Sequence, residues 1–312
     1  MADRRLQVFH AVAKHLSFTK AAEALFMTQP AVTFQIRQLE EHFNTRLFDR
    51  AHGHISLTSA GMMTLDYAER ILALSGELDT RLKELSGQVA GPLLIGASTT
   101  IADFLLPQVL GEFKARFPAV LLRLFMANSE AVQSRVAERS LDLGFIEGDS
   151  HLHSLVSDVC CDDELQIVCA PTHPLAKQQS ATPKSLTEHA YISREAGSGT
   201  REVIDHYFQK NDVSPDSLQV VMEVGSPEAL KGLVATGLGF AIMSRASFAM
   251  EMRLGRLVQI QLSPPLNRHF SVVYPKERFH SKLVNGFVEF AKQRLAAMQS
   301  AAESQARRLW RS

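Results

Sequence analysis

Apolar positions recur at helical spacing through the first 43 residues of the chain. The pattern predicts a packing helix over residues 4–15, a short helix over 18–25 and a third helix over 29–43. Pro30 suits the first turn of the third helix, because an N–H in that turn has no helical partner to lose. Thr28 directly before it can cap the helix.

The third helix has one apolar face, and most side chains on its other faces are polar. The side chains expected to face a core are Val32, Ile36, Leu39 and Phe43. The remaining faces carry Thr33, Phe34, Gln35, Arg37 and Gln38. A short helix, a tight turn and a second helix with donor and acceptor side chains near its start form the shape that enters the major groove of DNA. The pattern therefore predicts a unit that reads DNA sequence.

A two-stranded ribbon is expected after this pair of helices. Gly53 marks a turn between short apolar segments within residues 47–58, which is typical of a hairpin and would make the "wing" of a winged helix-turn-helix. Arg50 would lie on this ribbon and is the best candidate there for a phosphate or the minor groove. His52 and His54 are expected as exposed turn residues and not as metal ligands, since no third ligand lies nearby in the sequence.

One long helix is predicted from Ser59, its expected cap, to about Leu85. Two interpretations of its apolar stripe stay open: a dimer seam, which we favour, or packing within its own domain. Residues 86–92 then break the helix and form a hinge. The stripe consists of Ile71, Leu74, Leu78, Leu82 and Leu85.

Strand and helix patterns alternate over residues 93–300, which predicts mostly parallel α/β sheets in two lobes with a cleft between them. Expected strands are 93–97, 120–126, 141–146, 166–170, 190–193, 218–224, 239–243 and 269–274. Expected helices are 101–117, 130–139, one from about 200, 227–236 and 281–299. The predicted domains are the winged helix-turn-helix over residues 1–58, the long helix with its hinge over 59–90 and the two-lobed α/β domain over 91–300. Lobe I is expected to consist of residues 91–164 and 267–300, and lobe II of residues 165–266. The tail, residues 301–312, is expected to fray or to make a second nucleic-acid contact.

Composition narrows the class of protein. The 312 residues include 33 basic and 33 acidic side chains, so no global field draws the chain to nucleic acid. Residues 1–58 carry seven Lys/Arg against five Asp/Glu, so DNA affinity would have to come from a dimer and from placed contacts. No apolar run is long enough for a membrane span and no secretory signal is visible. The chain has three cysteines, Cys160, Cys161 and Cys169, and this odd count is most consistent with the reducing cytoplasm. The thiols are expected to be buried side chains or, alternatively, a redox switch.

Two segments of the α/β region have the composition of anion sites. Residues 96–101 follow the first strand with Ser98, Thr99 and Thr100, and residues 195–202 contain Ser198, Thr200 and Arg201. Hydroxyls, glycines and free amides at a helix start can bind a carboxylate, sulfate or phosphate, and Arg201 could add charge. Simple helix capping is the alternative for each segment. Secondary candidates at strand ends are Asn128, Ser129, Glu147 and Ser226.

Two other classes of protein could use an α/β region of this kind. An α/β hydrolase would use Ser98 or Ser198 as nucleophile, but no Gly-x-Ser-x-Gly elbow, phosphate loop or zinc spacing occurs, so we expect neither an enzyme nor a cofactor or metal. A pure solute-binding protein leaves about 90 N-terminal residues and the missing signal peptide unexplained. A small-molecule-binding or hydrolytic α/β protein without a DNA role is therefore kept only as the alternative function.

The chain resembles the LysR-type transcriptional regulators. The resemblance is nearly continuous over residues 4–65, and the α/β remainder has the family's order. It implies an α/β fold with an N-terminal winged helix-turn-helix, a long dimerising linker helix and a C-terminal two-lobed domain similar to periplasmic binding proteins. The matching segments are Leu6–Ala13, Ser17–Ala22, Leu25–Val32, Ile36–Glu40, Leu47–Arg50 and Leu57–Gly61.

The resemblance also implies partners: a dyad-symmetric site on double-stranded DNA, a small effector held between the lobes, a homodimer or homotetramer, and RNA polymerase for an activator. We expect the effector to be an anion and no membrane partner. Glutamines suit adenine edges, and Arg37 suits guanine or phosphate unless it pairs with Glu40 or Glu41. The expected DNA-binding residues are Thr28, Gln29, Pro30, Ala31, Thr33, Phe34, Gln35, Arg37, Gln38 and Arg50.

Phe34 departs from the family, which often has an arginine or similar residue at this position. Its ring could contact a thymine methyl or a sugar, or pack against a neighbouring residue. Together with the Gly197–Arg201 run, the Phe34 helix is most similar to members that govern sulfur assimilation or carbon fixation. The effector, the operator and the direction of regulation stay open.

Overall fold

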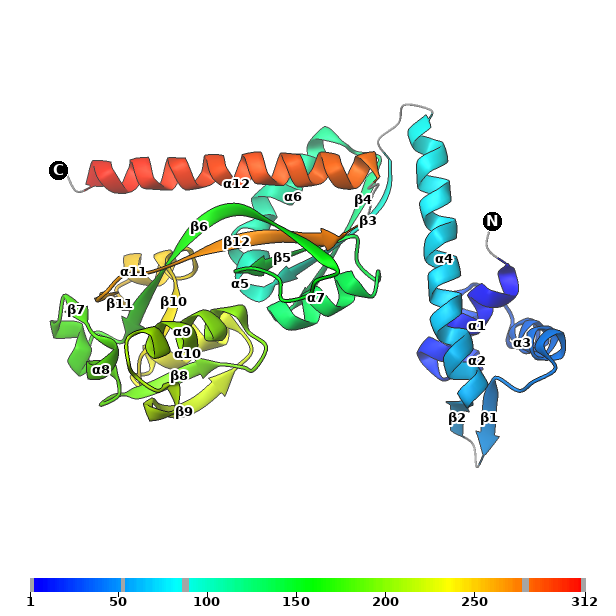
Figure 1. The fold of residues 1–312 in the computed structure, drawn as a ribbon, viewed down its shortest axis with the longest axis horizontal. Coiled ribbons are helices and arrows are strands. Elements are labelled where there is room, and N and C mark those ends of the chain that lie inside the picture. Colours follow the sequence, from blue (N-terminus) through cyan, green and yellow to red (C-terminus); the bar gives the residue numbers. More distant parts are fainter. Residues whose placement is uncertain (1–2, 52–53, 86–89, 277–280, 310–312) are drawn as a thin grey trace. The chain divides into compact units, whose positions relative to one another are not determined.

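The computed structural model describes residues 3–51, 54–85, 90–276 and 281–309. The chain forms two compact units, Met1–Gln88 and Val89–Ser312. The two units are called the N-terminal and the C-terminal unit, and each is described by itself (Figure 1).

The N-terminal unit is a winged helix-turn-helix followed by a long helix, as the sequence predicts. Three helices pack their apolar faces together, and Phe9, Ile36 and Leu47 are fully buried in the shared core. A two-stranded antiparallel ribbon follows, in which Phe48 pairs with Leu57. The elements are α1 (Arg4–His15), α2 (Phe18–Ala24), α3 (Gln29–Phe43), β1 (Phe48–Ala51), β2 (His54–Leu57) and α4 (Ser59–Leu85). The turn predicted at Gly53 and the neighbouring His52 lie outside the described residues.

Two local predictions in this unit are wrong. Phe43 is 47% exposed, because α3 ends there and Asn44 turns the chain into the left-handed region at φ 48°. The cap of α4 is Thr58 and not Ser59: the Thr58 hydroxyl accepts from the Gly61 amide at 2.9 Å and donates to the Arg46 carbonyl at 2.8 Å. Thr58 thereby fixes the start of the long helix to the segment before the ribbon.

The apolar stripe of α4 is exposed where the structure describes it. Ile71, Leu74 and Leu78 are all exposed, while the side chains of Leu82 and Leu85 lie outside the described ones. An apolar stripe of this length that its own unit leaves in solvent is typical of helices that pair with another helix.

The C-terminal unit is built on a long mixed sheet that two strands carry through both lobes. Its strand order is β4-β3-β5-β12-β6-β11-β7, with β10 also paired to β6. A separate two-stranded sheet, β8-β9, completes the second lobe. The strands are β3 (Gly91–Ser98), β4 (Val120–Ala127), β5 (Leu143–Glu147), β6 (Leu155–Cys169), β7 (Ser180–Ala181), β8 (Ala190–Arg194), β9 (Gln219–Val224), β10 (Ala241–Ser244), β11 (Val258–Leu262) and β12 (Leu266–Pro275).

Helices cover both faces of this framework (Figure 1). They are α5 (Thr99–Phe104), α6 (Leu106–Arg116), α7 (Ser129–Ala137), α8 (Pro183–Leu186), α9 (Gly199–Lys210), α10 (Pro227–Ala235), α11 (Ala249–Arg253) and α12 (Lys282–Leu309).

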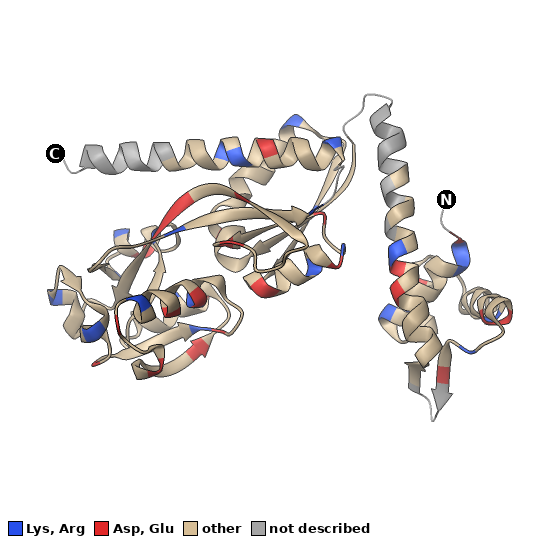
Figure 2. Ribbon diagram, in the orientation of Figure 1, with Lys and Arg blue, Asp and Glu red and all other residues tan. Residues whose placement is uncertain are grey.

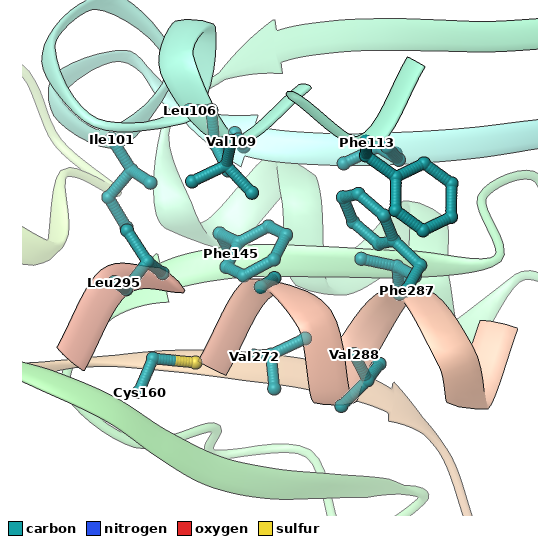
Figure 3. Close-up of a cluster of buried hydrophobic side chains, with 14 of the residues drawn as sticks. Ile101, Leu106, Val109, Phe113, Phe145, Cys160, Val272, Phe287, Val288 and Leu295 are labelled. Carbon is teal, nitrogen blue, oxygen red and sulfur yellow. The ribbon is translucent and has the colours of Figure 1, made fainter. Parts of the chain in front are cut away.

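Lobe I has an aromatic-rich core between its sheet and the helices α5, α6 and α12 (Figure 3). Phe113 of α6 meets Phe287 of α12 edge-on, with ring centroids 4.8 Å apart. The other face of the sheet is covered by α7, whose Val132 and Val136 are fully buried. In lobe II, α9 and α10 contribute to two further buried clusters around the β6 and β10 strands.

The structure corrects the expectation of mostly parallel sheets. The β3–β4, β3–β5, β8–β9 and β7–β11 pairs are parallel, but β12 runs antiparallel to β5 and β6, and β6 runs antiparallel to β10 and β11. Long strands that return between the lobes impose this mixture. The helix expected over residues 101–117 is two helices that meet at Leu105, and Pro107 lies in the first turn of the second one. Residues 301–309, expected to fray, continue α12.

Charge is distributed without strong segregation. Figure 2 shows that basic and acidic residues are interspersed along the described parts of both units. Within the described residues, no helix has the length and apolar character that a membrane span requires.

Candidate functional site

The N-terminal face of α3 presents a row of polar groups. Thr28 caps the helix by accepting from the Ala31 amide at 3.4 Å, as predicted. Thr28, Gln29 and Pro30 are exposed, and Ala31 and Thr33 are partly exposed. The Gln29 amide nitrogen donates to the Thr33 hydroxyl at 3.2 Å, and that hydroxyl donates to the Gln29 carbonyl at 3.0 Å. The helix start is therefore ordered and accessible, with hydrogen-bonding groups directed outward.

Farther along α3 the accessible side chains are Phe34, Gln35, Arg37 and Gln38. Phe34 is 55% exposed, so its ring is not buried in the unit's core. Arg37 is exposed, and within the described residues no ion pair joins it to Glu40 or Glu41. Glu40 instead accepts from the Leu47 amide at 2.8 Å and from the Phe48 amide. This leaves the Arg37 guanidinium available for an external acceptor.

Arg50 lies on β1 of the ribbon, paired in register with Ile55. Its side chain lies outside the described ones, so its expected contact with a phosphate stays a prediction.

A small pocket lies between the two lobes of the C-terminal unit. Its polar lining comes from the start of α5, the end of β8, the start of α9 and the end of β10, and an apolar wall completes it. The lining residues are Thr100, Arg194, Thr200, Pro227, Leu230, Ile242, Met243, Ser244 and Ser247. Hydroxyls around one guanidinium make a lining suited to a small polar ligand with anionic character.

The segment after β3 contributes from lobe I. Thr100 lines the pocket and is buried. Thr99 accepts from Nη2 of Arg194 at 3.0 Å, a hydrogen bond that joins the two lobes. Ser98 is buried, makes no cap hydrogen bond, and its Oγ has no partner among the described residues. The first predicted segment thus has one residue on the pocket and two beside it.

The segment before α9 contributes from lobe II. Thr200 lines the pocket, and Ser198 caps α9 by accepting from the Arg201 amide at 3.5 Å. The Arg201 guanidinium bonds Glu223 at 2.7 Å and the Arg194 carbonyl at 3.1 Å, which directs it along β9 and outside the pocket lining.

The secondary candidates mainly hold the lobes and their helices in place. Asn128 caps α7 through Oδ1 at 2.9 Å and donates from Nδ2 to the Ala196 carbonyl at 3.1 Å. Ser129 donates to Glu147, and both side chains are buried in lobe I. Ser226 caps α10 by accepting from the Ala229 amide at 3.3 Å.

Three polar lining residues were not among the sequence candidates: Arg194, Ser244 and Ser247. Arg194 is the main cationic group, with a side chain only 5% exposed, and its Nε donates to Glu195 at 2.9 Å. The sequence feature that could have identified Arg194 is its position at the end of a strand, directly before the glycine-rich segment. Ser244 similarly ends β10, and Ser247 follows in the next turn.

Among the described residues, no base is hydrogen-bonded to either candidate serine nucleophile of the hydrolase alternative. Ser98 makes no hydrogen bond to a described side chain, and Ser198 is a helix cap. Within the described residues, no group of three or more His, Cys, Asp or Glu is arranged to hold a metal ion.

The three cysteines are free and buried. Burial raises the pKa of Cys160 to about 11, that of Cys161 to about 12 and that of Cys169 to about 11. The reactive species is the thiolate, which would make up roughly one part in a thousand or less of each thiol near neutral pH. This environment favours the packing interpretation over the redox switch.

We therefore expect no reaction of Cys160, Cys161 or Cys169 with a maleimide at pH 7.5 during an exposure that fully labels the urea-unfolded chain. Intact-mass spectrometry of both samples gives the count of labelled thiols. Complete labelling of any one cysteine in the folded protein would contradict the buried environment.

A winged helix-turn-helix followed by a two-lobed unit with an interlobe pocket defines an effector-binding transcriptional regulator that binds DNA. A family model described as "Bacterial regulatory helix-turn-helix protein, lysR family" matches residues 4–62, and one described as "LysR substrate binding domain" matches residues 86–296. The chain belongs to the LysR family, whose members are transcriptional regulators and not enzymes.

Curated relatives extend over nearly the whole chain. A protein of Cyanophora paradoxa named "Probable RuBisCO transcriptional regulator" is 34% identical over 289 residues, which cover 91% of this chain and 89% of the relative. A protein of Trichormus variabilis with the same name is 31% identical over 287 residues, 91% of this chain and 85% of the relative. These relatives agree with the carbon-fixation side of the resemblance noted from the sequence.

Solved structures show the same architecture. Full-length CbnR complexed with its target DNA aligns with a TM-score of 0.70 at 22% identity, covering 94% of this chain and 99% of that one. The regulatory domain of CcmR from Synechocystis PCC6803, in complex with 2-PG, aligns with a TM-score of 0.60 at 26% identity, covering 65% of this chain and 96% of that one.

Proposed function

We propose that this protein regulates genes of carbon fixation in response to a small oxyanion bound between its lobes. The observation that supports this most is the identity of at least 30% with proteins named as RuBisCO transcriptional regulators, maintained over 91% of the chain. Identity spread over both units relates the DNA-binding half and the effector-binding half to the same kind of regulator.

The DNA-reading surface in this proposal is the exposed face of α3 together with the ribbon. Gln29, Thr33, Gln35 and Gln38 supply hydrogen bonds to base edges, and Arg37 and Arg50 supply charge for guanine or phosphate. Thr28 and the free amides of the first turn, with Pro30 and Ala31 beside them, receive a phosphate oxygen. Phe34, exposed on the same helix, contacts a thymine methyl or a sugar.

Gln29→Ala is expected to lower affinity for the target site roughly fivefold to a hundredfold, the loss of one bidentate base contact. Affinity for random duplex should change by less than about twofold, because non-specific binding depends on phosphates. Fluorescence anisotropy with both duplexes at the same salt concentration measures this, with Gln108→Ala, at an exposed position of α6, as control. An unchanged preference for the target would remove Gln29 from base reading.

The effector in this proposal is a small phosphorylated or carboxylated acid. The polar lining of the pocket and the 26% identity with a regulatory domain solved with 2-PG support this class of ligand. Ser98, Thr99, Thr100, Ser198 and Thr200 are the proposed hydroxyl and amide donors, while Asn128, Ser129, Glu147, Arg201 and Ser226 fix the elements that carry them. Isothermal titration of the full chain with 2-phosphoglycolate tests the class. Absence of heat at millimolar ligand, together with no shift of the melting temperature, would contradict it.

Assembly into a homodimer or homotetramer is part of the proposal. The exposed stripe on α4 supports a helical seam. The strand β4, at the edge of the long sheet, exposes Leu121, Leu124 and Met126, and β9 exposes Val220, Val221 and Met222. Apolar strand edges of this kind are typical of contact surfaces between copies. We further propose that the assembly acts in the cytoplasm as an activator that contacts RNA polymerase.

A further inference from the structure

The most buried charged pair of the C-terminal unit lies behind the effector pocket. Arg268 on β12 and Asp163 on β6 have side chains 2% and 5% exposed, and Nε of Arg268 donates to Oδ2 of Asp163 at 2.8 Å. The two residues lie where both crossing strands pass between the lobes. A pair this deeply buried is costly to desolvate, so excellent geometry and further hydrogen bonds are needed to retain it.

Each partner of the pair continues to a residue that lines the pocket. Nη1 of Arg268 donates to Oγ1 of Thr200 at 2.8 Å. The other oxygen of Asp163 accepts from the Ser244 hydroxyl at 2.7 Å. Thr200 and Ser244 both line the pocket, so one ion pair determines the orientation of two hydroxyls there.

The bond from Arg268 determines how the Thr200 hydroxyl is oriented. A guanidinium has only donors, so the Thr200 oxygen must accept from Arg268 and its own hydrogen must point elsewhere. No described group accepts that hydrogen, since the bond from Arg268 is the single side-chain hydrogen bond of Thr200. The bond from Arg268 occupies one lone pair of the Thr200 oxygen and leaves the hydroxyl hydrogen free to donate to a ligand.

The same relation occurs in lobe I. Nη2 of Arg194 donates to Oγ1 of Thr99 at 3.0 Å, so the Thr99 hydroxyl is also left as a donor. In addition, Nη2 of Arg268 and Oγ of Ser98 are buried polar atoms without a partner among the described residues. Unpaired buried donors are expensive, and their number here indicates capacity for an acceptor-rich ligand.

We propose that Arg268, held by Asp163, is a positioning residue of the effector pocket that orients the Thr200 hydroxyl so that its hydrogen is free to donate to a ligand. Thr99, which lies beside the pocket in lobe I, is oriented in the same way by Arg194. The free hydrogen of Thr200 and the unpaired Nη2 of Arg268 favour a phosphate or carboxylate oxyanion over neutral analogues of the same size. This inference rests on the proposed function and adds the mechanism of its ligand selectivity.

The test is a double-mutant cycle on the full chain with 2-phosphoglycolate as the probe, read by isothermal titration. Thr200→Val is expected to weaken binding about tenfold to a hundredfold, as for loss of one hydrogen bond to a charged group, whereas Thr200→Ser stays within about threefold. Arg268→Lys loses the planar fork and is expected to weaken binding by a similar factor. Because Arg268 acts through the Thr200 hydroxyl, the variant with both Thr200→Val and Arg268→Lys should bind the probe as tightly as the single variant with the lower affinity.

The matched control is Arg245→Lys, at an exposed arginine that pairs with Glu164 at 3.4 Å and is not itself a lining residue, and it should leave the affinity unchanged. Losses that multiply in the double variant would give Arg268 a role independent of Thr200 and overturn the proposal. If Arg268→Lys does not fold, the comparison of Thr200→Val with Thr200→Ser decides, and equal affinities overturn the proposal. Wild-type protein that does not bind the probe contradicts the proposed effector class and this inference together, whereas binding that Thr200→Val leaves intact contradicts this inference alone.

Discussion

Replacing Gly61 with alanine is expected to abolish DNA binding by destabilising the N-terminal unit. A Cβ at this position would lie 2.0 Å from the Leu47 carbonyl oxygen and 3.0 Å from a methyl carbon of Leu57. The Leu47 oxygen, itself a main-chain atom, also accepts from the Thr58 amide at 3.0 Å, so it cannot move without shifting the backbone. Neither α4 nor the ribbon can make room by rotating a side chain.

The cost should reach at least about 3 kcal/mol, the upper part of the range for overpacked sites. The helix-propensity gain of alanine over glycine, about 1 kcal/mol, does not offset it. Circular dichroism melting and anisotropy with target DNA measure stability and binding. Gly286→Ala in α12 is the matched control, because a Cβ there meets nothing within 4 Å. Target affinity within twofold of wild type would show that the close approach of α4 to Leu47 is not required.

Replacing Gly199 with alanine is expected to weaken effector binding by at least about tenfold while DNA binding without effector persists. Gly199 is the first residue of α9 in lobe II, and a Cβ there would lie 2.8 Å from Oγ of Ser129 and 2.9 Å from Cβ of Glu147, both in lobe I. These neighbours are buried and bonded to each other. The lobes must separate at this point, which moves Thr200 away from the pocket.

A loss of tenfold corresponds to about 1.4 kcal/mol, well within the cost of overpacking a closed interface. Calorimetry with 2-phosphoglycolate gives the affinity, and anisotropy with target DNA gives the effector-free binding. Gly232→Ala in α10 of the same lobe is the control, since a Cβ there meets nothing within 4 Å. Wild-type effector affinity in Gly199→Ala would mean that the contact of α9 with lobe I does not position the pocket.

The N-terminal unit could be predicted closely because its signals are local. The α3 helix has the expected bounds, Gln29–Phe43, since Thr28, Pro30 and the apolar spacing of Val32, Ile36 and Leu39 all lie within the helix they define. The errors at Phe43 and Ser59 concern element ends, where one left-handed residue or one neighbouring hydroxyl decides the outcome.

The C-terminal unit was predicted as a succession of elements but not as a topology. Apolar runs locate strands, whereas their direction depends on partners far along the chain, and β12 pairs with β5 and β6 from across more than 100 residues. The short elements β7, α8 and α11, with two to five residues each, and the five-residue β11 were missed. Segments this short carry little periodicity.

The side chains around the interlobe pocket were likewise predictable only where the sequence signal is local. Glycine and hydroxyl runs indicated Thr99, Thr100 and Thr200, because helix starts have a local signature. Arg268 gave no such signal, since its partners Asp163 and Thr200 are 105 and 68 residues away in the chain. Charged groups brought together by crossing strands become visible only when the fold is known.

In the proposed function, α3 and the ribbon read specific DNA sites under the control of an oxyanion. The most direct measurement is selection of sheared genomic DNA from the organism of origin by the purified full chain, with and without 2-phosphoglycolate, followed by sequencing of the bound fragments. We expect enrichment of dyad-symmetric sites upstream of carbon-fixation genes and a change of occupancy on adding the ligand. Bound fragments indistinguishable from the input under both conditions would contradict it.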